Sequence, residues 1–218
     1  MKQKVYVWDP IIRLFHWILV ASFTVAYFTG EDESLVHIYA GYIVLGLIAV
    51  RLLWGLVGSK HARFSDFVRS PVQALVYLKG LVGGGVKNYV GHNPAAGWMV
   101  IALLVSLLAT TVSGLQVYGL EGHGPLAQTV AERKLAPEAG GGTGTVRMNA
   151  EHEDEAGDED GGEDGEEFWE EVHEFFANFT VFLIALHLLG VALSSYRHRQ
   201  NLVRAMVTGY KEEETASD

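Results

Sequence analysis

Two histidines, His173 and His187, lie fourteen residues apart in the last apolar stretch of the chain. On an α-helix, fourteen residues return to within about 40° of the starting direction and rise about 21 Å. One helix face therefore carries two imidazoles at two depths. Imidazole binds haem iron, zinc and copper, and a buried histidine in a membrane span is costly and usually functional. The spacing predicts two separate ligand positions on one helix.

The elements that must hold these histidines are transmembrane helices. The chain has 218 residues, of which 49% are hydrophobic, and the apolar residues fall in four runs. Each run is close to the roughly 20 residues that a bilayer-spanning helix needs. We predict an all-α integral membrane protein, a four-transmembrane-helix bundle. The predicted spans are residues 11–29, 37–57, 97–118 and 168–196.

The N-terminus has a second interpretation, a cleaved signal peptide, because Lys2 and Lys4 precede an apolar run. We disfavour it because Asp9, Pro10 and Arg13 interrupt that run and no small-residue cleavage site follows it.

The distribution of lysine and arginine predicts the orientation of the spans. Thirteen of the sixteen basic residues fall on one side if the N-terminus is cytoplasmic, and only Arg133, Lys134 and Arg147 fall on the other. Basic residues concentrate on the cytoplasmic side of membrane proteins. We therefore expect both termini in the cytoplasm, and loops 30–36 and 119–167 outside.

This orientation pairs the histidines by depth. His16 begins the first span on the cytoplasmic side, and His37 begins the second span on the outer side. On the last span His173 is outer and His187 is inner. We therefore predict an inner pair, His16 with His187, and an outer pair, His37 with His173.

Two imidazoles at each depth suit the two axial positions of a haem better than a structural zinc, which needs four ligands around one ion. Taken alone, a histidine near a helix end is more often an interfacial polar residue, and the coincidence of depth and spacing favours ligation. The chain has no cysteine, which excludes thiolate-bound iron–sulfur clusters and covalent CxxCH haem. A non-redox membrane anchor or metal transporter remains an alternative.

Three further residues are candidates for contacts with haem propionates or quinone. Arg13 and Arg51 are cations near the cytoplasmic ends of their spans. They suit carboxylate recognition, although snorkelling to the interface explains them equally well. His92 is a third candidate for the same role, and we otherwise treat it as a surface residue. The same surface assignment applies to His61, His123, His152 and His198.

The net charge of −10 comes from one segment, because residues 151–171 hold thirteen of the 26 acidic residues and no basic residue. Glycine together with like charge cannot bury a core, so we expect the acidic insert in the external loop 119–167 to be disordered. It is most simply a solvated loop. A landing patch for a basic redox partner is an alternative, and a calcium site is disfavoured because the ligand register is wrong. We assign residues 211–218 to a cytoplasmic tail.

Several motifs together resemble one family. They are VWDPIIRLFHW, the run HIYAGYIVLGLIAVRLLWGLVGSKHARF, the turn GHNPAAGWM and the paired histidines of the last span. The chain resembles the bacterial cytochrome b561 family, in the branch of the nickel–iron hydrogenase b-type cytochrome subunits. The resemblance covers residues 5–118 and 168–210, and the acidic insert departs from it.

The resemblance implies a di-haem cytochrome b domain over residues 1–210, with two non-covalent b haems bound by His16, His37, His173 and His187. It implies a location in the bacterial inner membrane and transfer of single electrons between a quinone pool and a partner. The partners implied are a hydrogenase or dehydrogenase subunit and a periplasmic c-type cytochrome. A superoxide–quinone oxidoreductase is a rival, which the acidic outer loop argues against. Whether the chain is itself an enzyme stays open. We expect lipid contact and no nucleic-acid partner, and a homo-oligomer is left open.

Overall fold

The computed structural model describes residues 2–30, 34–83, 89–127 and 160–214. The chain divides into two compact units. Unit 1 comprises Met1–Thr111 and Phe176–Asp218, and unit 2 comprises Val112–Phe175.

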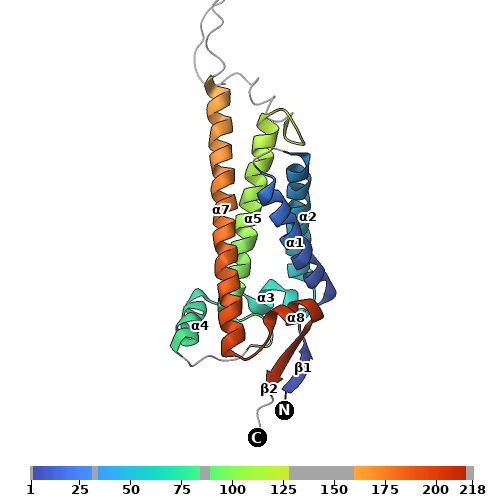
Figure 1. The fold of residues 1–218 in the computed structure, drawn as a ribbon, viewed down its shortest axis with the longest axis vertical. Coiled ribbons are helices and arrows are strands. Elements are labelled where there is room, and N and C mark those ends of the chain that lie inside the picture. The colour runs from blue at the N-terminus through green and yellow to red at the C-terminus, as the bar shows by residue number, and fades with distance from the viewer. Residues whose placement is uncertain (1, 31–33, 84–88, 128–159, 215–218) are drawn as a thin grey trace, which may run out of the picture. The chain divides into compact units, whose positions relative to one another are not determined.

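Four helices of the described residues are long and apolar enough to cross a membrane, as the sequence predicts. They are α1 (Pro10–Phe28), α2 (Leu35–Val57), α5 (Pro94–Leu120) and α7 (Asp160–Arg197) (Figure 1). The chain is therefore a mainly helical, multi-pass membrane protein.

Polar residues fix where these helices begin. The Asp9 carboxylate accepts a hydrogen bond from the backbone N–H of Ile12, at 2.9 Å, and Pro10 occupies the first turn of α1. The Asn93 side chain accepts from the N–H of Ala96, at 2.8 Å, before α5. Such caps satisfy backbone donors that have no partner within the helix.

The core of unit 1 lies between α1, α2 and the first part of α5. Val44 and Ile48 of α2 and Leu107 of α5 are buried together, and Leu19 and Phe23 of α1 pack against them. Many other apolar side chains of these helices point out of the protein. They suit contact with lipid tails, which are as apolar as the side chains themselves.

A buried hydroxyl pair joins α5 to α7 within unit 1. Ser106 Oγ and Thr180 Oγ1 are 2.7 Å apart, and both side chains are buried. Hydrogen bonds of this kind connect helices in a bilayer because polar groups there have no water to bind.

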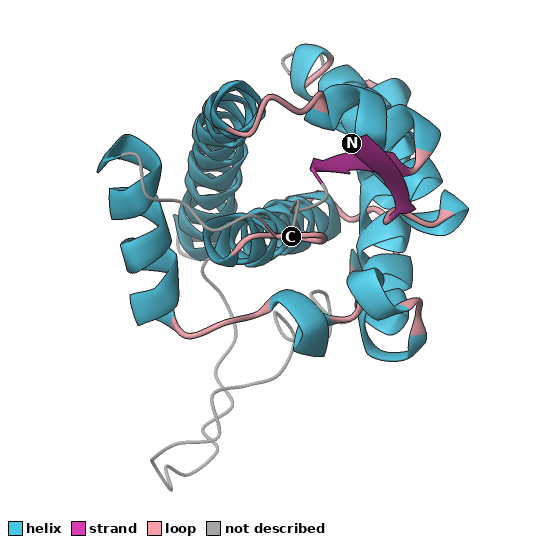
Figure 2. Cartoon of the chain, turned by 90° about the horizontal axis from the view of Figure 1, so that it is seen from below, coloured by secondary structure: helices cyan, strands magenta, loops and turns pink. Residues whose placement is uncertain are grey.

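The link between α2 and α5 contains short helices, namely η1 (Lys60–Ala62), α3 (Phe64–Phe67) and α4 (Pro71–Gly83). Ser70 lies directly before α4, and its Oγ accepts from the N–H of Gln73 at 3.4 Å. A last helix, α8 (Leu202–Thr208), follows α7. Figure 2 shows these short helices in cyan with the loops between them in pink.

The two ends of the described chain pair in a small antiparallel sheet, which the all-α prediction missed. β1 (Lys2–Tyr6) pairs with β2 (Tyr210–Glu214), in a register that runs from Lys2 opposite Glu214 to Tyr6 opposite Tyr210. Part of the segment predicted as a tail is therefore a strand. Lys4 lies opposite Glu212, and such opposite charges stabilise cross-strand pairs. The pairing places both ends of the chain at the same end of unit 1.

Unit 2 contains the end of α5, the residues up to 127, and the start of α7. The prediction of disorder for the acidic insert is wrong for residues 160–167, because α7 begins at Asp160. Acidic residues near the N-terminus of a helix are stabilised by the helix dipole. Residues 128–159, with the rest of the insert, lie outside the described residues.

Candidate cofactor sites

The inner pair of histidines comes together in unit 1. His16 lies on α1 and His187 on α7, and the two imidazoles are within electrostatic range of each other. The Nδ1 atom of His16 is buried and has no hydrogen-bond partner. Residues 171 positions apart in the sequence thus bring two imidazoles to one place, at least one of them with an unsatisfied ring nitrogen.

Arg51 is a buried cation of unit 1, with 4% of its surface exposed, and it acts electrostatically on His92, as His187 does. Its guanidinium carbon is 4.9 Å from the ring centroid of Phe64 and 5.8 Å from that of Phe67. Aromatic faces attract cations, but they do not satisfy N–H donors. The Nη1 atom of Arg51 has no hydrogen-bond partner, so the site holds a cation with a donor still available.

The negatively charged carboxylate of Asp9 attracts the guanidinium of Arg51. Its carboxylate accepts hydrogen bonds from Ser59 Oγ, from Trp54 Nε1 at 3.2 Å and from the N–H of Ile12. Burial by itself raises the pKa of Asp9, but these hydrogen bonds favour the charged form and together hold the pKa below its ordinary value. Asp9 is thus an anion held in place by several donors.

Arg13 joins α1 to the end of α8. Its Nη1 atom donates to the carbonyl oxygen of Val207 at 2.6 Å, while its Nε atom is buried without a hydrogen-bond partner. Gly209 ends α8 with a φ of 87°, and a Cβ there would lie 2.8 Å from the carbonyl oxygen of Trp8. Glycine is needed at this position both for the backbone conformation and for the space.

His92 is enclosed, in contrast to its surface assignment from the sequence. Its ring centroid lies 4.6 Å from those of Trp8 and Phe67, and its Nδ1 atom is buried without a hydrogen-bond partner. Burial is the main reason why the pKa of His92 falls to about 3, and repulsion from nearby cationic groups adds to it. These groups are Arg51, Lys211, His187 and His61.

Buried polar atoms that lack a hydrogen-bond partner indicate whether these residues fit a haem. Five buried side-chain polar atoms of the described residues lack a hydrogen-bond partner, and four belong to Arg13, His16, Arg51 and His92. Buried polar groups normally have partners. A haem offers iron to imidazole and two carboxylates to cationic donors, so this set of residues matches the chemistry of a haem.

The outer histidines are each anchored through Nδ1. His37 Nδ1 is 2.9 Å from the carbonyl oxygen of Ala26, within unit 1, and His173 Nδ1 is 3.4 Å from Ser113 Oγ, within unit 2. Ligating histidines commonly bond their second nitrogen in this way. Because the two residues belong to different units, their pairing stays a prediction.

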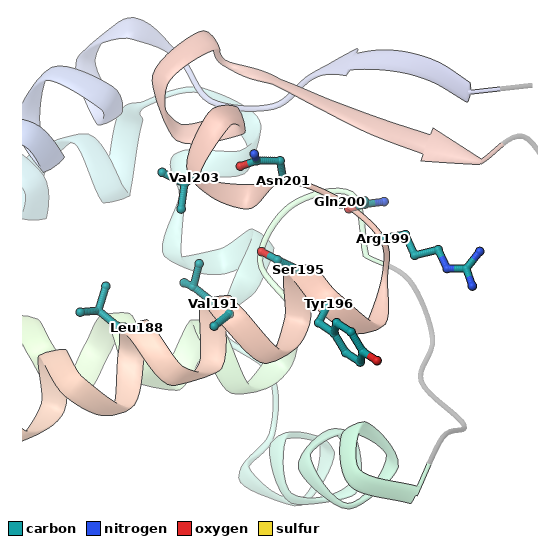
Figure 3. Close-up of a pocket in the computed structure, with 9 residues that line it drawn as sticks. Leu188, Val191, Ser195, Tyr196, Arg199, Gln200, Asn201 and Val203 are labelled. Atoms are coloured by element: carbon teal, nitrogen blue, oxygen red, sulfur yellow. The ribbon is translucent and has the colours of Figure 1, made fainter.

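A groove of about 580 Å³ runs along the end of α7 and the start of α8. Figure 3 shows Leu188 and Val191 at one end, and Gln200 and Asn201 toward the other. Gln200 is 8% exposed, and its Oε1 atom has no hydrogen-bond partner. The full lining is Leu188, Val191, Ala192, Ser195, Tyr196, Arg199, Gln200, Asn201 and Val203.

These groove residues are not among the binding residues predicted from the sequence. The signal available was the helical spacing of 188, 191, 192, 195 and 199 on the face next to His187. Nothing in the sequence indicates that α8 folds back to form the second wall.

Among the residues the structure describes, no group of three or more histidine, aspartate or glutamate side chains is placed to hold a metal ion.

Comparison with known proteins gives one family. The model of the prokaryotic cytochrome b561 family matches residues 7–209. The chain is 28% identical over 152 residues to a probable Ni/Fe-hydrogenase B-type cytochrome subunit of Rhizobium leguminosarum bv. viciae, which covers 56% of the chain and 63% of the relative. The proteins of the same name from Azotobacter vinelandii and Cupriavidus necator are 29% and 22% identical.

The Azotobacter match covers 56% of the chain and 62% of the relative, and the Cupriavidus match covers 96% and 87%. The chain thus spans slightly less than two thirds of the first two relatives. No solved structure matches the chain.

Proposed function

Because the chain belongs to the prokaryotic cytochrome b561 family and is therefore a membrane electron-transfer cytochrome that binds haem b, we propose that it carries two b haems at two depths. In this proposal it passes single electrons between quinone and a redox partner. The observation that carries the proposal is that His16 and His187 lie within electrostatic range of each other, while His187 and the buried cation Arg51 both act on the buried His92.

The inner haem is assigned to His16 and His187 as axial ligands. Arg13 and Arg51 each have a buried N–H without a hydrogen-bond partner, and arginine favours carboxylates. These two residues are therefore the proposed propionate contacts, with His92 as a third. A bound haem supplies a one-electron couple whose potential depends on its ligands, burial and neighbouring charges.

The outer haem is assigned to His37 and His173. The hydrogen bond from His37 Nδ1 to a carbonyl oxygen supports this role, because a carbonyl only accepts. Nδ1 therefore carries the proton, and Nε2 keeps its lone pair for iron.

Quinone is assigned to the groove beside α8. Its apolar wall, formed by Leu188, Val191 and Val203, suits an isoprenoid tail, and its polar end has an unsatisfied acceptor on Gln200. A quinol hydroxyl can donate to that acceptor. Leu188 directly follows His187, so a quinone in the groove lies close to the proposed inner ligand.

The proposed partner is a hydrogenase, because the matched relatives are named as hydrogenase cytochrome subunits. A dehydrogenase or a periplasmic c-type cytochrome is the alternative partner. Purified hydrogenase and the cytochrome, reconstituted together, should reduce the haems with hydrogen as electron donor. Haems that are reduced by quinol and stay oxidised under hydrogen would contradict the hydrogenase assignment and leave the quinone assignment standing.

Haem counting tests the central proposal. The full chain, purified in mild detergent, should give low-spin b-type spectra after dithionite reduction and two haems per chain in a pyridine haemochrome assay. One haem per chain would contradict the two-site assignment. A folded, colourless protein would contradict haem binding.

Both termini are assigned to the cytoplasm. The chain has no cysteine, so single introduced cysteines report cleanly on sidedness. Ser65→Cys in α3 should resist a membrane-impermeant maleimide in intact cells, and His123→Cys after α5 should react. The reverse labelling pattern would contradict the orientation.

A further inference from the structure

Two consecutive residues of α5 contact the ring of His173 within unit 2. Ser113 Oγ is 3.4 Å from His173 Nδ1, and Gly114 lies beside the same ring. We infer that Ser113 and Gly114 position His173, with Ser113 holding the Nδ1 edge of the ring and Gly114 providing the space that the ring occupies. This inference rests on the proposed function, since it takes His173 as an axial haem ligand.

Gly114 leaves room that no other residue type leaves. A Cβ built at this position would lie 2.8 Å from Cε1 of His173 and 3.0 Å from its Nδ1. Carbon atoms do not approach an aromatic ring so closely, so any side chain would displace the imidazole. Gly114 has an ordinary helical backbone, in contrast to Gly209. The reason for glycine here is therefore the space and not the backbone conformation.

Three other glycines of the spans provide comparisons for Gly114. A Cβ at Gly41 or Gly46 of α2, or at Gly190 of α7, would meet nothing within 4 Å. Alanine fits at these positions without moving a neighbour. Gly41, Gly46 and Gly190 therefore do not share the close approach that Gly114 makes to the ring of His173, whereas Gly55, Gly97 and Gly119 approach other neighbours.

Ser113 contacts the ring at Nδ1, so a bond from this ring to a metal would come from Nε2. A neutral imidazole carries a proton on one nitrogen and a lone pair on the other. With Nε2 bound to iron, Nδ1 carries the proton and donates it to Ser113 Oγ. Ser113 is only 1% exposed, so little water competes for this contact.

The same hydrogen bond changes the basicity of the imidazole of His173. A partner on Nδ1–H makes the imidazole more basic, and a more basic ligand favours ferric over ferrous iron. Ser113 should therefore lower the potential of the haem that His173 binds. His37 Nδ1–H donates the corresponding bond to the backbone carbonyl oxygen of Ala26, which a side-chain substitution cannot remove, so Ser113 is the position at which this effect can be tested.

The experiment compares Gly114→Ala, Ser113→Ala and Ser113→Thr with Gly46→Ala as the control, each as the full chain in detergent. Gly46 lies on the face of α2 opposite His37, and a Cβ there meets nothing within 4 Å. Haems per chain, the EPR spectrum of the ferric low-spin haems and a potentiometric titration are the readouts. Gly114→Ala should lose one haem or its low-spin signal, whereas the control variant keeps two. Ser113→Ala should keep both haems, shift one potential upward and change one EPR signal, and Ser113→Thr should restore both properties.

Gly114→Ala with two haems and an unchanged EPR spectrum would overturn the role of Gly114. An unchanged potential and EPR spectrum in Ser113→Ala would overturn the role of Ser113, and this comparison decides the matter if Gly114→Ala does not fold. His173→Ala distinguishes a failure of the ligand assignment from a failure of the positioning inference. If it keeps both haems, the ligand assignment fails; if it loses one haem while the Ser113 and Gly114 variants match the wild type, only the positioning inference fails.

Discussion

The guanidinium of Arg51 lies 4.9 Å from the centre of the Phe64 ring. Arg51 belongs to α2 and Phe64 to the short helix α3, so the end of a membrane span and the following link together hold a buried cation. An aromatic face attracts this charge without using its N–H donors. The arrangement fixes Arg51 in place and leaves Nη1 available to a carboxylate.

Removing this cation should change the potential of one haem. In Arg51→Met the inner haem should titrate lower, by on the order of 50 mV, because a nearby positive charge favours the reduced form. Arg51→Lys should show a smaller shift. The measurement is a potentiometric titration, with Arg69→Met in the exposed link as the control. Two unchanged potentials in Arg51→Met would count against the propionate contact.

The packing of Phe64 against α2 should be sensitive to one methyl group. A Cβ at Gly55 would lie 2.1 Å from Cε2 of Phe64. Gly55→Ala should therefore destabilise the protein by about 1–3 kcal/mol, measured as a lower midpoint of thermal unfolding in detergent. Gly46→Ala on the same helix has free space and should leave the midpoint unchanged or raised. Equal midpoints for the two variants would show that the link does not pack on α2 in this way.

The hydrogen bonds to Asp9 should make stability depend on pH in the acid range. Because the pKa of Asp9 is lowered in the folded protein, its charged form stabilises the fold above its ordinary value near 3.8, and this contribution disappears as the pH falls through the lower folded value. Each pH unit in this window contributes at most about 1.4 kcal/mol.

Thermal unfolding between pH 6 and pH 3 tests this dependence. Asp9→Asn should reduce the acid-induced loss of stability, and Ser59→Ala should reduce it partly, because one of several hydrogen bonds is removed. A wild-type pH profile in Asp9→Asn would assign the acid sensitivity to other groups.

Substitution of the proposed ligands should separate the two haems. His16→Ala and His187→Ala should each lose the same haem and keep the other, and His37→Ala should lose the second. The physical reason is that each haem needs both axial imidazoles to stay low-spin and tightly bound. Haem stoichiometry and reduced-minus-oxidised spectra are the measurements. His16→Ala and His187→Ala variants that lose spectrally different haems would contradict the inner pair.

Local sequence patterns were sufficient to predict the membrane helices and to select the candidate ligands. Runs of about 20 apolar residues predict spans because each helix must satisfy its own backbone in lipid. The spacing of His173 and His187 fixes a common helix face because the α-helix has a constant rise and turn. The caps at Asp9, Asn93 and Ser70 are equally local, since each acts on a backbone N–H three residues away.

Contacts between distant segments were decided only by the tertiary structure. The pairing of β1 with β2 joins the two ends of the chain, and the enclosure of His92 depends on Trp8 and Phe67. Arg51 meets Phe64 only because the link folds back on α2, and the groove exists only because α8 turns back beside α7. Local pattern fixes which residues share a helix face, whereas the partners of that face depend on packing between segments that the sequence places far apart.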